Sequence, residues 1–185
     1  MAPRPMDANV LRTALTSFSK TVREPVELVL GGSAALVLVG HLHRQTADSD
    51  VVASNPDLGR LQNAIRSVEE SDQLPPGWLN GSIQSYTHVL PPDYRQRCLP
   101  FPPFVAPHPM RVLLVSRRDI LVMKFYAQRA RDIDDIEQLI PTASELAFVA
   151  AQLTRIALHE PEKAEQMQQL LDDWHNDPST ADSER

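Results

Sequence analysis

The sequence predicts an α+β fold, in which short strands alternate with helices and a series of helices closes the chain. The chain has 185 residues, of which 42% are hydrophobic and 23% charged, as expected for one domain with a sizeable core. Three apolar runs of strand length lie at residues 26–30, 48–53 and 111–115, among segments with helical periodicity. After residue 115 only helical periodicity remains.

The first seventy residues carry clear start and stop signals for their elements. Asp7 is placed to cap a helix, and Pro25 ends that region. The strand at 26–30 runs into the sharp turn Gly31-Gly32-Ser33, and a helix opens directly from that turn. The expected elements are a helix after Asp7, a strand at 26–30, a helix at 34–39, a strand at 48–53 and a helix at 57–70.

The segment 75–109 is rich in proline and cannot be mostly helical. We expect a loop at 78–81, an irregular or edge strand at 83–89, and ordered loop up to the strand at 111–115. The expected C-terminal elements are helices at 116–128, from Asp132 onward, at 144–158 and at 161–174. As domains, the sequence predicts a core at 1–140, a helical extension of the same domain at 141–175 and a disordered tail at 176–185.

Charge and cysteine content exclude several classes of protein. The net charge of −6 disfavours a general nucleic-acid binder and direct binding to duplex DNA. Residues 95–131 are nevertheless basic, which indicates either a nucleotide-sized anion site or a set of solvated arginines. The single cysteine, Cys98, excludes an internal disulfide framework and suits a reducing compartment. The apolar stretch 28–42 is too short for a bilayer, which needs about 20 residues, so we expect a cytoplasmic protein without a leader or membrane contact.

Three features of the sequence carry chemistry. The Gly31-Gly32-Ser33 turn between a strand and a helix allows backbone N–H groups to approach a phosphate. Asp48 and Asp50 are two residues apart in a strand, so both project to one face and can share a divalent cation. Lys124 lies in the apolar run 120–126, where a charge is costly without an anionic partner.

Each feature also has an ordinary structural explanation. A Gly-Gly pair is often only a turn, and an Asp-x-Asp pair is often two loop acids. Lys124 could extend to solvent, or it could form a structural salt bridge with Asp132 or Asp135. Only their combination, in strand-turn-helix-strand order, is specific.

That combination resembles a known superfamily. The segments that carry the resemblance are Leu30-Gly31-Gly32-Ser33-Ala34-Ala35-Leu36 and Arg44-Gln45-Thr46-Ala47-Asp48-Ser49-Asp50-Val51. It continues at Trp78-Leu79-Asn80, over 91–97, and over 115–139, which includes Lys124, Asp132 and Asp135. The chain is similar, over about 28–139, to the polymerase-beta-type nucleotidyltransferases, and within them to the minimal bacterial branch akin to the AbiEii/MenT toxins.

The resemblance implies a small mixed sheet flanked by helices, followed by C-terminal helices. It implies that Asp48 and Asp50 bind Mg²⁺ (or Mn²⁺) and act in catalysis together with Lys124. It further implies that Gly31, Gly32 and Ser33 cradle the triphosphate of an NTP, and that Arg44 and Thr46 belong to the substrate site. Asp132 is another candidate for substrate binding, but we favour it as the N-cap of a helix.

The resemblance leaves the acceptor open between tRNA, protein and a small molecule. Because related enzymes occur in toxin–antitoxin operons, it also implies an antitoxin or DNA-binding protein as a partner. Ser49 replaces a hydrophobic residue between the acids, and 80–89 supplies no third carboxylate. A catalytically weak nucleotide-binding or protein-interaction module on the same fold is therefore the alternative.

Overall fold

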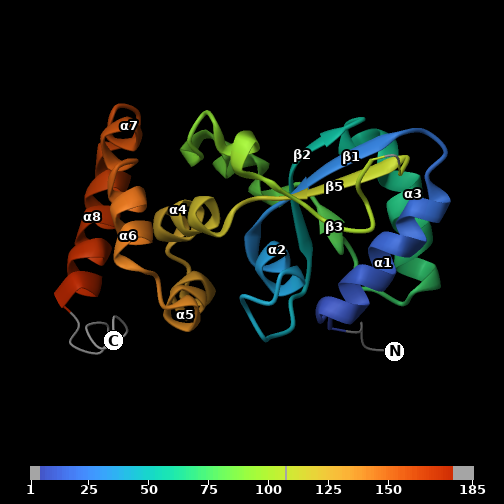
Figure 1. The fold of residues 1–185 in the computed structure, drawn as a ribbon, viewed down its shortest axis with the longest axis horizontal. Helices are drawn as coiled ribbons and strands as arrows, with labels where there is room; N and C mark the ends of the chain where they lie inside the picture. The colour runs from blue at the N-terminus through green and yellow to red at the C-terminus, as the bar shows by residue number, and fades with distance from the viewer. Residues whose placement is uncertain (1–4, 107, 177–185) are drawn as a thin grey trace. The chain divides into compact units, whose positions relative to one another are not determined.

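A five-stranded mixed sheet is the centre of the first part of the chain in the computed structural model (Figure 1). The structure describes residues 5–106 and 108–176. The strand order is β3-β2-β1-β5-β4. The strands are β1 (Val26–Leu30), β2 (Ser49–Asn55), β3 (Leu79–Asn80), β4 (Leu99–Pro100) and β5 (Met110–Leu114). β1 is antiparallel to β2 and parallel to β5, and β3 is parallel to β2, which confirms the predicted α+β class and the small mixed sheet.

The chain divides into two compact units, which we describe separately. The sheet unit comprises Met1–Thr87 and Asp93–Ser116, and the helical unit comprises His88–Pro92 and Arg117–Arg185. The boundary predicted at residue 140 lies inside the helical unit.

The sheet unit contains the helices α1 (Ala8–Thr21), α2 (Gly32–Leu38) and α3 (Leu58–Ser71). The carboxylate of Asp7 caps α1, as predicted, by accepting from two backbone N–H groups at the first turn. α1 contacts both α2 and α3. Phe18 of α1 packs edge-on against Trp78, with ring centroids 6.3 Å apart. The Trp78 side chain is fully buried, and its Nε1 donates to the Ile65 carbonyl at 3.3 Å, so Trp78 is a core residue.

The helical unit contains α4 (Arg117–Ala127), α5 (Ala130–Leu139), α6 (Ala143–Ala150), α7 (Leu153–Ala157) and α8 (Pro161–Asn176). α8 packs against α4, α6 and α7 (Figure 1). Every residue of α4 from Asp119 to Tyr126 is buried, so α4 is the central helix of this unit. None of the helices in the described residues is long and apolar enough to cross a membrane.

The proline-rich segment is more ordered than the sequence predicts. Part of the expected loop at 78–81 forms β3, because the Ser49 N–H donates to the Trp78 carbonyl at 2.5 Å and ties the segment to β2. The expected irregular or edge strand at 83–89 is instead a 3-10 helix, η1 (Ser82–Val89). It begins where the Ser82 N–H donates to Asn80 Oδ1 at 2.8 Å. A second 3-10 helix, η2 (Tyr94–Arg97), precedes the short edge strand β4.

The helix predicted at 144–158 is broken into α6 and α7. The Gln152 N–H donates to the Val149 carbonyl at 3.0 Å, three residues back, which tightens the chain between the two helices. No glycine or proline marks this break in the sequence. Asn176 ends α8, and the remainder of the tail predicted to be disordered lies outside the described residues.

Candidate functional site

The turn Gly31-Gly32-Ser33 is held directly against the strand that carries the two acids. The Gly31 N–H donates to the Asp50 carbonyl at 2.9 Å. Gly32 has a φ of +58°, and a Cβ placed there would lie 2.6 Å from Asp50 Oδ2. A Cβ on Gly31 would lie 2.7 Å from Val52 Cγ2. Both glycines are therefore needed for the turn to approach β2 so closely.

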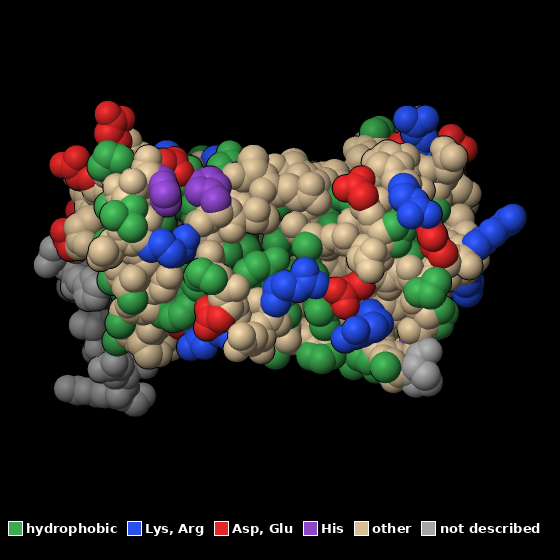
Figure 2. Space-filling view, turned by 90° about the horizontal axis from the view of Figure 1, so that it is seen from above, with side chains coloured by type: hydrophobic (Ala, Val, Ile, Leu, Met, Phe, Trp, Pro, Cys, Tyr) green, Lys and Arg blue, Asp and Glu red, His purple; other side chains and the backbone are tan. Residues whose placement is uncertain are grey.

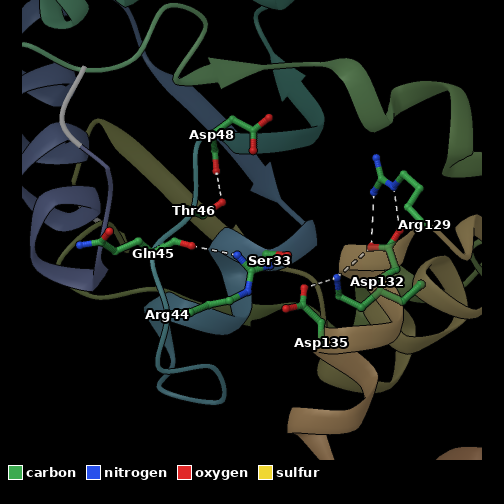
Figure 3. Close-up of polar contacts among 9 residues, drawn as sticks. Ser33, Arg44, Gln45, Thr46, Asp48, Arg129, Asp132 and Asp135 are labelled. Atoms are coloured by element: carbon green, nitrogen blue, oxygen red, sulfur yellow. Dashed lines mark hydrogen bonds and ion pairs between the residues drawn. The ribbon is translucent and has the colours of Figure 1, made fainter. Parts of the chain in front are cut away.

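Asp48 and Asp50 flank the start of β2, and both are half-buried. The Thr46 hydroxyl donates to the Asp48 carbonyl at 3.1 Å, as drawn in Figure 3. Thr46 itself is buried, and its backbone pairs with Met6 ahead of α1. This pairing fixes the segment that leads into the acidic strand.

Ser49, between the two acids, is buried on β2 with 1% of its surface exposed. Its hydroxyl has no hydrogen-bond partner within the part of the chain that the structure describes. A buried hydroxyl without a partner is destabilising, so the replacement of a hydrophobic residue by Ser49 weakens the packing of this strand.

Arg44 reaches back from the loop after α2 to the glycine turn (Figure 3). Its guanidinium donates to Ser33 Oγ at 2.7 Å and to the Gln45 carbonyl at 2.9 Å. The sheet unit thus brings together the predicted turn, both acids, Arg44 and Thr46.

Two polar residues that the sequence analysis did not assign to the site also contact the acids. Asn80 of β3 is the register partner of Asp50, and its Nδ2 lies 3.5 Å from Asp48 Oδ2. The Ser82 hydroxyl donates to Asp50 Oδ1 at 2.8 Å. The sequence shows the motif Trp78-Leu79-Asn80. It does not show that β3 pairs with β2, which is what brings Asn80 to the two acids.

These oxygen-rich side chains fit Mg²⁺ or Mn²⁺. Carboxylate oxygens, with those of water and phosphate, are the ligands that these hard cations take. Among the described residues, no group of three or more His, Cys, Asp or Glu side chains could hold a metal. The two carboxylates of Asp48 and Asp50 suit a cation that takes its remaining ligands from water and phosphate, which is the usual situation for Mg²⁺.

Lys124 and Asp132 belong to the helical unit and form a buried ion cluster there. Lys124 Nζ lies 3.1 Å from Asp132 Oδ1 and 2.6 Å from Asp135 Oδ2, and all three side chains are at most 4% exposed. Arg129 Nε also binds Asp132, at 2.7 Å. Figure 3 shows the two carboxylates turned toward the same ammonium group. The salt bridge considered for Lys124 is present, with both aspartates at once.

The predicted role of Asp132 as a helix cap is wrong. α5 begins at Ala130 and its N-cap is Arg129, so Asp132 is the third residue of the helix. Its carboxylate lies in the first turn, where a negative charge is favourable. Both of its oxygens are engaged with Lys124 and Arg129. A buried ammonium left without a counter-charge would cost more than a missing cap, so the carboxylate serves the ion cluster.

Several arginines of the basic segment 95–131 form ion pairs within their own unit. Within each unit many of its arginines contact acids, and the face shown in Figure 2 has basic and acidic side chains interspersed. The ion pairs are Arg95 and Arg111 with Glu27, Arg97 with Asp93, Arg117 with Glu145, and Arg129 with Asp132. Arg95, Arg111 and Arg129 are about half exposed or more, as expected of solvated arginines, whereas Arg97 and Arg117 are largely buried, with 14% and 24% of their side chains exposed.

A mixed sheet whose glycine turn is bonded to an Asp-x-Asp strand is the arrangement expected of a nucleotidyltransferase. Residues 11–176 match the family described as "Nucleotidyltransferase of unknown function (DUF6036)". Because the match covers most of the chain, the protein belongs to this nucleotidyltransferase family. No curated protein and no solved structure matches the chain.

Proposed function

We propose that this protein transfers a nucleoside monophosphate from an NTP to an acceptor hydroxyl, with Mg²⁺ or Mn²⁺ held by Asp48 and Asp50. The observation that carries the proposal is the contact of the glycine turn with β2, through the Gly31 N–H and the Asp50 carbonyl. A triphosphate bound at this turn would lie beside two carboxylates. The carboxylates would repel the triphosphate unless a divalent cation lay between them and the phosphate oxygens.

In the proposed reaction, the acceptor oxygen forms a bond to the α-phosphorus of the NTP. The bond from that phosphorus to the bridging oxygen breaks, pyrophosphate leaves, and the hydroxyl proton passes to solvent water. A bound divalent cation supplies charge neutralisation of the phosphoryl oxygens. Asp48 and Asp50 hold the cation, the turn binds the phosphates, and Arg44 and Thr46 complete the substrate site.

Lys124 and Asp132 enter the proposal as a phosphate contact and a substrate-binding group. Because they are bound to each other and are buried, any substitution of either residue changes the stability of the helical unit as well. Their contribution to catalysis must therefore be measured beside the free energy of unfolding.

The acceptor remains one of three classes: tRNA, a protein or a small molecule. In the AbiEii/MenT-like interpretation, a toxin–antitoxin pair would supply an antitoxin or DNA-binding protein as the partner. One observation favours a second candidate function, a nucleotide-binding module with weak or no catalysis. The side chains that β3 and the start of η1 bring to the acids, Asn80 and Ser82, are neutral, and neither is a general base.

A thermal-shift experiment tests the metal-dependent nucleotide site. Each NTP is expected to raise the melting temperature of the parent with Mg²⁺ and much less with EDTA. The Asp48→Ala, Asp50→Ala double variant should fold and lose this shift. Glu70→Ala, an exposed residue of α3, is the control and should keep it. If the double variant binds Mg²⁺ and NTP like the parent, the proposed site is wrong.

A labelling experiment tests transfer itself. Each NTP, labelled at the α-phosphate, is incubated with the protein and total cellular RNA or protein. General-base assistance is worth about 10²–10⁴-fold in rate, so we expect slow, acceptor-dependent labelling. Rapid transfer to a generic acceptor would contradict the assignment of this site as one without a general base.

A further inference from the structure

Asn80 and Ser82 are fixed by the backbone around them, which determines what they present to the acids. Asn80 Oδ1 accepts from the Ser82 N–H at 2.8 Å, and its Nδ2 donates to the Gly77 carbonyl at 3.0 Å. Rotating the amide by 180° would lose both hydrogen bonds. The Asn80 side chain therefore presents an N–H group, and not its oxygen, to Asp48 Oδ2.

An N–H group that faces a carboxylate orients it but does not ligate a cation. The Ser82 hydroxyl donates to Asp50 Oδ1 at 2.8 Å and is likewise a neutral group. Gly32 lies against the other carboxylate oxygen, Asp50 Oδ2. The Asp50 carboxylate is thus held between the glycine turn and η1, and the β3 side adds hydrogen bonds without adding negative charge.

We propose that Asn80 and Ser82 are positioning residues that keep this site at two carboxylates, so that it takes a divalent cation as the metal–triphosphate complex and not as the free ion. This inference rests on the proposed function. The charge of the ligands sets the affinity of a protein for a hard divalent cation. Two carboxylates leave a bound cation short of ligands, and the oxygens of a triphosphate complete its coordination.

The test measures binding of Mn²⁺ alone and of the preformed complex of Mn²⁺ with inorganic triphosphate. Free Mn²⁺ is followed by its paramagnetic resonance signal, and the complex is titrated by calorimetry. For the parent we expect the complex to bind at least about tenfold more tightly than Mn²⁺ alone, because the triphosphate supplies the missing ligands. If Mn²⁺ alone binds as tightly as the complex, the inference is wrong, although the proposed function stands.

Substitutions that add a third carboxylate sharpen the test. Asn80→Asp is nearly isosteric, and it should tighten the binding of Mn²⁺ alone by about tenfold or more, since ligand charge rises. Ser82→Asp, at an exposed position, should have the same effect and serves if Asn80→Asp fails to fold. Asn63→Asp, an exposed residue of α3, is the matched control and should leave Mn²⁺ binding unchanged.

Removing the hydroxyl tests positioning separately. Ser82→Ala should weaken binding of the manganese–triphosphate complex several-fold, because Asp50 loses the hydrogen bond that orients its carboxylate. If the Asn80→Asp and Ser82→Asp variants both fold and bind Mn²⁺ no more tightly than the parent does, the inference is overturned. If the Asp48→Ala, Asp50→Ala variant binds the complex like the parent, the proposed function itself fails at its metal site.

Discussion

The two units each hold a pair of aspartates close in sequence, and the pairs have opposite surroundings. Asp132 and Asp135 are buried, and they share the ammonium group of Lys124. Asp48 and Asp50 are half-buried, and β3 and η1 offer them hydrogen bonds from neutral side chains. The first pair has its counter-charge inside the helical unit, whereas the second lies directly against the glycine turn.

Under the proposed function, Asp48 and Asp50 bind a cation, whereas Asp132 and Asp135 also hold the helical unit together. Removing one member of a buried ion cluster is destabilising, because it leaves an unpaired buried charge. Asp48 and Asp50 are only half-buried, so replacing them is expected to cost less stability than leaving a buried charge unpaired. The predictions below test this contrast, beginning with the largest expected effect.

Lys124→Met should lower the free energy of unfolding of the helical unit by about 3–5 kcal/mol, because Asp132 and Asp135 would remain buried with their counter-charge reduced. Urea unfolding followed by circular dichroism measures the loss. Lys20→Met, at an exposed position of α1, is the control and should change the stability by less than about 0.5 kcal/mol. A neutral or stabilising Lys124→Met that only weakens NTP binding would show that Lys124 acts on phosphate and is not needed for the fold.

Gly32→Ala should destabilise the sheet unit and abolish the nucleotide-dependent thermal shift. A non-glycine residue at positive φ costs about 1–2 kcal/mol, and at this position the new Cβ would also meet Asp50 Oδ2 at 2.6 Å. Gly40→Ala is a matched control, since Gly40 has a φ of +78° but no atom within 4 Å of an added Cβ. Equal effects of the two substitutions on stability and nucleotide binding would contradict the close fit of the turn to Asp50.

Ser49→Ala should raise the stability of the sheet unit by about 1 kcal/mol, because it removes a buried hydroxyl without a partner in the described residues. Trp78 is the only tryptophan left in a Trp174→Phe background, so its fluorescence reports unfolding of the sheet unit. Metal-dependent nucleotide binding should be unchanged, because Asp48 and Asp50 are retained. A loss of stability would show that the Ser49 hydroxyl has a function in the strand.

The sequence was most informative where local chemistry decides the structure. The strand at 26–30, the cap at Asp7 and the turn at Gly31-Gly32-Ser33 were all predicted, because capping, proline and glycine act over a few residues. β3 was missed, because its two residues form a strand only through β2, about thirty positions earlier in the chain. Asn80 and Ser82 were missed for the same reason.

The function of Asp132 shows a second limit of sequence analysis. An aspartate near a helix start is a common cap, and that preference suggested the wrong role. Lys124, on a buried helix, binds the same carboxylate. Because an unpaired buried charge costs more free energy than an uncapped helix end, the ion pair determines where the carboxylate lies. The sequence predicts Asp132 or Asp135 as the partner of Lys124, but it does not show that Lys124 contacts both.

The smallest expected effect is a loss of stability of the helical unit in acid. Burial acts to raise the pKa of Glu145, but the Thr142 N–H and the Arg117 guanidinium outweigh it and leave that pKa lowered. Hydrogen bonds from the Tyr126 hydroxyl and the His88 ring lower the pKa of Glu160. These carboxyls bind a proton less tightly in the folded state than in the unfolded chain. Their stabilisation is therefore complete above the ordinary glutamate value of 4.5 and is lost as the pH falls below it.

This loss is measured by comparing the urea midpoint of unfolding at neutral pH with the midpoint at pH values below the ordinary glutamate pKa. Both side chains are partly exposed to solvent, so we expect less than about 1 kcal/mol. The Glu145→Gln, Glu160→Gln double variant should be less stable at neutral pH and should lose less stability on acidification, because it has no charge to gain or lose at these positions. Glu165→Gln, an exposed residue of α8, should follow the parent. If the double variant loses as much stability in acid as the parent does, these two carboxylates do not cause the acid sensitivity, and the buried aspartate cluster around Lys124 becomes the group to test next.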